Sequence, residues 1–148
     1  DYEGYKNLMK LSSIGCLEGF YYKPRVDKEV LRQYSGGLIA LSGCLKGEVA
    51  CLIAQEQYEM AESVVNTYKD IFGEENFYLE MQDHGIEGQK KVNDKLPDVA
   101  KKCGVGLVAS NDCHYIYPNQ SFVHEVLLCV QTATNLEDPK RMRFQTNE

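Results

Sequence analysis

A unit of apolar strand, polar turn and amphipathic helix recurs three times after Gly37. The short apolar runs at 38–41, 77–81 and 107–109 are the predicted strands. Strands that alternate with helices at a spacing of about 30 residues favour parallel pairing through βαβ crossovers. The predicted fold class is therefore α/β, with parallel strands and flanking helices. Because three units cannot close an eight-stranded barrel, we expect part of a barrel.

The helices are predicted from apolar residues spaced three and four positions apart. Asp27 is a good N-cap for a short helix that ends before Gly36. Pro97 interrupts the apolar pattern between the second and third strands, so a kink or a break is expected there. The other expected helices lie at 4–14, 48–55 and 58–72, and from Pro118 onward.

The composition is that of an ordinary globular protein. The 148 residues suit one domain, and no apolar run reaches the roughly 20 residues of a membrane helix. The net charge of −6 excludes a chain that binds nucleic acid over its whole surface. Local contacts are possible at Lys23 and Arg25 and at 140–143. The six cysteines show no Cys-x-x-Cys pair and are interpreted as reduced thiols of a cytosolic protein.

Side chains that can bind a metal or take part in acid/base chemistry follow each predicted strand. Cys44 follows the first strand, His84 the second, and Asp112 and His114 the third. Functional groups of parallel α/β folds gather at the carboxyl ends of strands, so a site is expected at this rim. In an extended segment Asp112 and His114 share one face, where they would hold a divalent metal or act as an acid/base pair. The alternative is that Asp112 caps a turn and His114 lies on the surface.

The other residues of this rim have several interpretations. Cys44 is a candidate thiolate ligand or a small buried thiol. His84 is a candidate ligand, general acid/base or phosphate contact, or else a histidine of a surface turn. His124 is expected to be structural. Glu48 is expected to be an acid favoured at a helix start.

Glu80 is a charged residue in the middle of the second predicted strand. By strand alternation it shares a face with Tyr78 and Gln82. That face is expected to be a barrel interior with polar content, or one end of the site.

Several motifs resemble the PHP (polymerase and histidinol phosphatase) domain as it occurs in the replicative DNA polymerases of bacteria. They are the stretches 20–27, 37–44, 77–85, 110–115, 126–131 and 136–144. The resemblance implies a partial, distorted (βα)7 barrel with divalent metal ions, zinc or manganese, at the strand ends. Members that keep the metals can act as a 3′→5′ exonuclease, and the others only support the polymerase.

The resemblance also assigns residues. Asp112 and His114 match the closing Asp-x-His ligand pair, and Cys44 matches the cysteine ligand. His84 and Arg25 lie in family motifs and are candidates for a catalytic role, with Arg25 as a phosphate contact. The opening His-x-His motif and the ligands after it would precede Asp1. The chain is therefore expected to be an inactive fragment that holds part of the ligand set.

The implied organisation is the C-terminal part of a PHP domain over 1–132 and a tail over 133–148 that leads toward a polymerase domain. The implied partners are DNA, the polymerase core of the same chain and replisome subunits, in the cytoplasm and without a membrane. Open sheet edges predict a homodimer. Two other functions remain open: a structural module that braces the polymerase, and a barrel related to small-molecule phosphatases or amidohydrolases.

Overall fold

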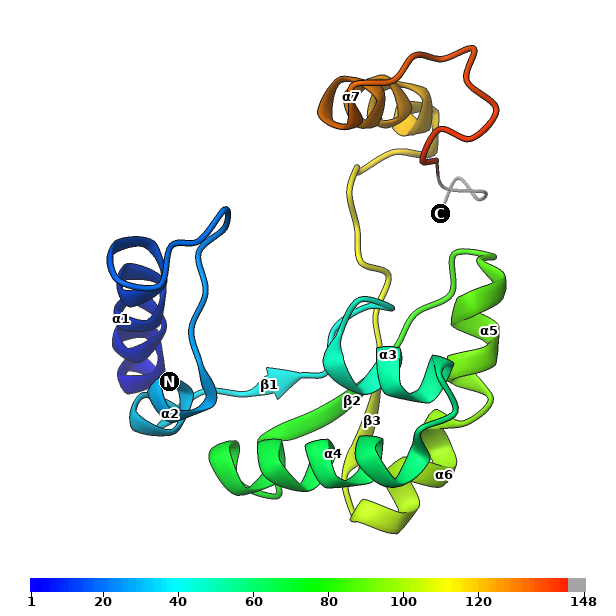
Figure 1. Cartoon of the computed structure of the whole chain (residues 1–148). Coiled ribbons are helices and arrows are strands. Elements are labelled where there is room, and N and C mark those ends of the chain that lie inside the picture. The colour runs from blue at the N-terminus through cyan, green and yellow to red at the C-terminus, as the bar shows by residue number, and fades with distance from the viewer. Residues whose placement is uncertain (144–148) are drawn as a thin grey trace.

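A parallel three-stranded sheet forms the centre of the computed structural model, which describes residues 1–143 (Figure 1). Its strands are β1 (Ala40–Leu41), β2 (Phe77–Met81) and β3 (Gly106–Ala109), with β2 in the middle. In the register, Ala40 lies opposite Phe77 and Tyr78 lies opposite Gly106. The parallel α/β arrangement predicted from the sequence is confirmed, although the first strand is shorter than the expected 38–41.

Helices occupy both crossovers between the strands. The first crossover holds α3 (Glu48–Ala54) and α4 (Tyr58–Phe72), and the second holds α5 (Glu87–Asn93) and α6 (Leu96–Cys103). Before the sheet come α1 (Tyr2–Leu17) and α2 (Lys28–Gln33); after it come the 3₁₀ turn η1 (Pro118–Gln120) and α7 (Ser121–Thr132). The predicted break at Pro97 is confirmed, because this proline lies in the first turn of α6. The predicted cap is also confirmed, since the Asp27 carboxylate accepts the Val30 N–H at 2.8 Å.

The hydrophobic core lies between β2 and the four crossover helices. Its buried members are Val49, Ala50, Ile53, Ala61, Val65, Phe77, Leu79, Val92, Leu96, Val99, Ala100, Cys103 and Val105. β2 contributes Phe77 and Leu79 to this core, while Tyr78 and Glu80 point to the opposite face and are half-buried. The sheet is therefore apolar on its helix-covered face and partly polar on the other.

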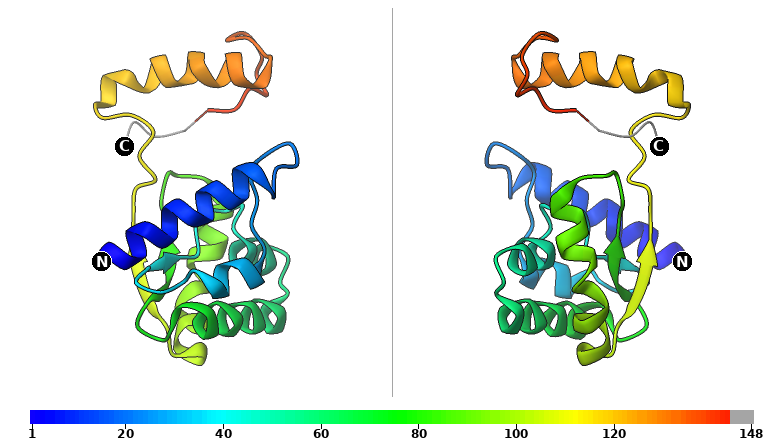
Figure 2. Two further views of the ribbon diagram at one scale, coloured as in Figure 1. Left: turned by 90° about the vertical axis from the view of Figure 1, so that its left-hand side faces the viewer. Right: turned by 90° about the vertical axis from the view of Figure 1, so that its right-hand side faces the viewer.

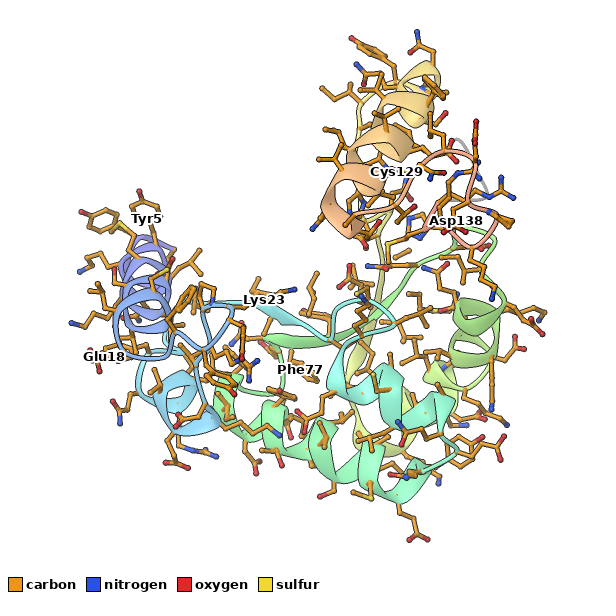
Figure 3. All side chains as sticks on the ribbon, turned by 45° about the horizontal axis from the view of Figure 1, so that its top comes forward. Tyr5, Glu18, Lys23, Phe77, Cys129 and Asp138 are labelled. Atoms are coloured by element: carbon orange, nitrogen blue, oxygen red, sulfur yellow. The ribbon has the colours of Figure 1, made fainter. Side chains whose placement is uncertain are left out.

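The first two helices pack beside the sheet on the β1 side (Figures 1 and 2). Helix α1 approaches the turn before β1 so closely that a side chain at Gly4 would overlap the backbone carbonyl of Gly37. Asn7 donates a hydrogen bond from Nδ2 to the Gly36 carbonyl at 2.8 Å. Glycine is thus required at this contact by the space available. Tyr5 projects from the outer side of α1 (Figure 3).

Helix α7 projects beyond the carboxyl end of β3, at the end of an extended connection (Figures 1 and 2). The helix expected from Pro118 onward is confirmed by η1 and α7. Its apolar residues are largely uncovered in the described part of the chain, where Phe122, Leu127 and Val130 are 61%, 60% and 76% exposed. The Arg141 side chain pairs with Glu125 at 2.6 Å and folds part of the 133–148 tail back onto α7, and residues 144–148 lie outside the described residues.

Helices cover one face of this sheet, and its three strands do not close on themselves within residues 1–143. The (βα)7 barrel therefore remains a prediction. Among the described residues, no helix has the length and apolar character needed to cross a membrane.

The central strand predicts a clear stability effect. Leu79 is completely buried, so Leu79→Ala removes apolar contacts and leaves a cavity in the core. We expect the free energy of unfolding to fall by about 2–5 kcal/mol in a urea titration. Ile39→Ala is the control, because Ile39 is 67% exposed and its truncation is expected to change stability by less than about 0.5 kcal/mol. Equal losses in the two variants would contradict this core.

Candidate functional site

The candidate site lies where the three strands end. The chain leaves each strand on the same edge of the sheet, and the segments 42–47, 82–86 and 110–117 begin there (Figure 1). Parallel pairing makes this convergence unavoidable, because all carboxyl ends share one edge. The predicted rim therefore exists, and the position of each side chain along it decides its chemistry.

A hydrogen-bond network around Glu80 joins the three strand ends. The Ser110 hydroxyl and the Gln82 amide both donate to Glu80 Oε1, the second at 3.1 Å. The Glu80 backbone N–H donates to Ser42 Oγ at 2.9 Å. Half-buried carboxylates need donors to offset lost hydration, and these partners supply them. The face that carries Glu80 is therefore polar, while its place in a barrel interior or a site remains a prediction. Ser42 and Ser110 each directly follow a strand, which is the sequence signal for their part in this network.

Cys44 has an exposed thiol beside a small cavity. The cavity has a volume of about 10 Å³ and is also lined by Glu80, Gln82, Gln89 and Asn93. Gln82 Oε1 is buried there and forms no hydrogen bond to any residue that the structure describes. Cys44 is therefore accessible and next to polar groups, which excludes the alternative of a small buried thiol.

His84 is buried, with only 3% of its surface exposed, so the alternative of a surface-turn histidine is wrong. Its Nδ1 lies 2.8 Å from Nε2 of Gln89, and its Nε2 lies 2.5 Å from the carbonyl oxygen of Asn111. The side chain thus connects the turn after β2 with the turn after β3. A direct catalytic role for His84 remains a prediction.

Asp112 and His114 lie exposed in the loop between β3 and α7. The strand ends at Ala109, and Asp112 has a φ of 46°, which is left-handed rather than extended. The alternation expected of a continuous strand therefore does not apply to this pair. Instead, Nδ1 of His114 lies 2.6 Å from the backbone carbonyl oxygen of Asp112. The pair is joined through the backbone of a tight turn.

His124, which is expected to be structural, lies in α7 beside this loop. Its ring centroid lies 5.1 Å from that of His114 and 5.5 Å from that of Tyr115. Desolvation and then repulsion from the His114 charge lower the pKa of His124 below its ordinary value. The spacing of ten residues across a loop and a helix gives no periodic signal, so only the folded chain brings the two histidines together.

Arg25 and Glu48 belong to other contacts. The Arg25 guanidinium lies 5.3 Å from the ring centroid of Tyr21, within the exposed segment that follows α1. Glu48 begins α3, as expected, and pairs with Lys28 at 2.9 Å. Burial opposes its charge, but hydrogen bonds from Lys28 and Tyr68 outweigh this and lower the pKa of Glu48.

The three predicted metal ligands fit a divalent metal by their chemistry, since thiolate, carboxylate and imidazole are the donors that zinc prefers. Within residues 1–143, however, no three side chains of His, Cys, Asp or Glu lie together as a metal-binding group. The described residues offer Cys44, Asp112 and His114 as separate donors at one rim. The metal assignment therefore remains a prediction.

The strand-end site and the parallel α/β fold are accompanied by a family match. Residues 1–84 match the PHP domain family, and the chain belongs to this family. The whole chain is also similar to DNA polymerase III subunit alpha from several bacteria. It is 49% identical over 148 residues to that of Thermus aquaticus, covering 100% of this chain and 12% of the relative.

Two further relatives carry the same description. The chain is 45% identical over 145 residues to DNA polymerase III subunit alpha of Treponema pallidum, which covers 98% of this chain and 12% of the relative. It is 45% identical over 148 residues to that of Deinococcus radiodurans, covering 100% of this chain and 11% of the relative. The chain thus spans a small part of the length of the relatives that it matches.

The network at Glu80 gives a testable prediction. Ser110→Ala removes a donor to the half-buried carboxylate, so the free energy of unfolding is expected to fall by about 1–3 kcal/mol in a urea titration. Ser13→Ala is the matched control, because this exposed hydroxyl bonds only to the carbonyl of Met9 in its own helix among the contacts described. A Ser110→Ala protein as stable as Ser13→Ala would show that the network contributes nothing.

Proposed function

We propose that the chain is part of the PHP domain of a bacterial DNA polymerase III alpha subunit and acts in DNA replication. The observation that carries this proposal is the 49% identity to such a subunit over all 148 residues. Similarity over the whole chain supports a common domain rather than a shared short motif. The corresponding partners are DNA, the polymerase core of the same chain and replisome subunits, in the cytoplasm.

The proposed chemistry is metal-dependent hydrolysis of a phosphodiester, as a 3′→5′ exonuclease. Cys44, Asp112 and His114 would supply a thiolate, a carboxylate and an imidazole to zinc or manganese. A divalent ion supplies a hydroxide near neutral pH and stabilises negative charge on phosphoryl oxygens. Three donors are fewer than the four that zinc usually takes, so further ligands would have to come from elsewhere in the protein.

The second candidate is a structural module that braces the polymerase without chemistry of its own. The observation in its favour is the exposed apolar surface at both ends of the described chain. Tyr2, Tyr5 and Leu8 on α1 are 75%, 57% and 56% exposed, and α7 adds its uncovered apolar residues. Surfaces of this kind are typical of protein–protein contacts. A homodimer through open strand edges is a related possibility.

Metal analysis and activity of the full-length protein separate the two candidates. If the rim holds a metal, Asp112→Ala and His114→Ala each remove a ligand. Loss of a hydrogen bond that supports a ligand lowers metal affinity by about 10- to 100-fold, and loss of the ligand itself is expected to lower it further. Both substitutions would also abolish 3′→5′ degradation of single-stranded DNA. Metal content is measured by atomic emission after dialysis, and degradation with 5′-labelled DNA.

Asp83→Ala is the control, because Asp83 is an exposed acid at the same rim whose carboxylate accepts the Gly85 N–H. It is expected to keep both metal and activity. A full-length protein that folds normally but binds no zinc or manganese would favour the structural module. Hydrolysis of a histidinol-phosphate-type ester, with none of DNA, would favour the small-molecule phosphatase.

A further inference from the structure

His84 connects two loops that the sequence separates by 27 residues. It is one of three buried polar or charged side chains among the described residues, and the other two, Gln82 and Gln89, lie close to it in the sequence. A buried imidazole needs a hydrogen-bond partner for its ring nitrogens. Here both nitrogens have partners on different elements, so the ring joins α5 to the turn after β3.

The backbone N–H of His84 determines which atom is donor and which is acceptor in each of these hydrogen bonds. The His84 backbone N–H can only donate, and Gln89 Oε1 accepts it at 2.8 Å, which orients the Gln89 amide. The Gln89 amide nitrogen then donates to His84 Nδ1 at 2.8 Å. In a singly protonated ring the proton must therefore lie on Nε2, which donates to the Asn111 carbonyl at 2.5 Å.

The Asn111 carbonyl belongs to the peptide unit that precedes Asp112. Rotation of this unit about the N–Cα bond of Asp112 is the φ angle, which is 46° in the structure. A residue other than glycine persists in this left-handed region only when its surroundings hold it there. On the other side of Asp112, the carbonyl of the following peptide unit contacts His114 Nδ1 at 2.6 Å. An imidazole thus contacts each of the two peptide units that flank Asp112.

We propose that His84 is a positioning residue: its imidazole, held in one tautomer by Gln89, fixes the peptide unit before Asp112. The direction of the Asp112 carboxylate then follows from a backbone that is held against the turn after β2. His84 acts through the backbone and does not itself touch a ligand or substrate. Its effect on metal affinity rests on the proposed function, whereas its hold on the Asn111 carbonyl does not.

Two substitutions of His84 separate its two hydrogen bonds. The amide nitrogen of His84→Gln can occupy the place of Nε2 and still donate to Asn111. His84→Asn places its amide near Nδ1, where it can meet Gln89 but cannot reach Asn111. Both variants replace the ring with a neutral amide, and they differ by one methylene, so a stability measurement on each one accounts for the difference in packing. Circular dichroism checks that each one folds.

The first readout is the Asn111 carbonyl itself. Labelling the full protein chain with carbonyl-¹³C asparagine and ¹⁵N aspartate selects Asn-Asp steps, which the printed sequence contains at 93–94 and 111–112. Asn111→Gln assigns the signal by removing it, and Asn93 is an internal reference. We expect the Asn111 carbonyl resonance to move upfield in His84→Asn, where its hydrogen bond is lost, and to stay near the wild-type position in His84→Gln.

The second readout is metal affinity of the full-length protein, measured by competition with a chelator. His84→Asn is expected to weaken zinc binding by about 10- to 100-fold, as other losses of ligand-supporting hydrogen bonds do, and His84→Gln is expected to restore most of it. If the wild type binds no metal while the carbonyl resonance responds as expected, the proposed metal function fails and the positioning role stands.

Gln89→Met tests the orienting step, and keeps the proposal testable if His84→Asn does not fold. The methionine keeps the length of the side chain but loses both hydrogen bonds to His84. We expect the Asn111 resonance to move in the same direction as in His84→Asn. An unchanged Asn111 resonance in His84→Asn or in Gln89→Met, or an equal shift in His84→Asn and His84→Gln, would overturn the proposal.

Discussion

The structure depends on the burial of one face of β2. Phe77 and Leu79 pack against the crossover helices, and the strand that they anchor pairs with both β1 and β3 in parallel. Side chains alternate along a strand, so the same burial sends Tyr78 and Glu80 to the opposite face. The polar network at the strand ends is thus a direct consequence of the apolar core, because a charge can occupy β2 only on the uncovered side and only with donors around it.

The elements of the fold were largely predictable from the sequence. The helices and strands follow from local periodicity, and Asp27 and Pro97 act as their chemistry requires at a helix start. Helix α7 also forms where it was expected, and its apolar residues are exposed in the described chain. Periodicity shows that a helix has an apolar face, but it does not say which partner covers that face.

The candidate site was less predictable than the fold. The sequence placed Cys44, His84, Asp112 and His114 at the correct rim, because parallel strands share a carboxyl edge. It could not give the left-handed turn at Asp112, since one backbone angle decides whether two residues share a face. Nor could it show that His84 is buried and bonded to Asn111, because that contact depends on how two turns distant in sequence meet.

The loop after β3, residues 110–117, makes one contact with the body of the protein and another with α7. At its start it is held to the body through the buried imidazole, and at its end it continues into α7, whose His124 lies against His114. The candidate ligand residues Asp112 and His114 therefore lie between a contact with the body and a contact with α7. If a partner binds α7 better with this loop in one arrangement, thermodynamic linkage requires that ordering the loop favours binding of that partner by the same factor.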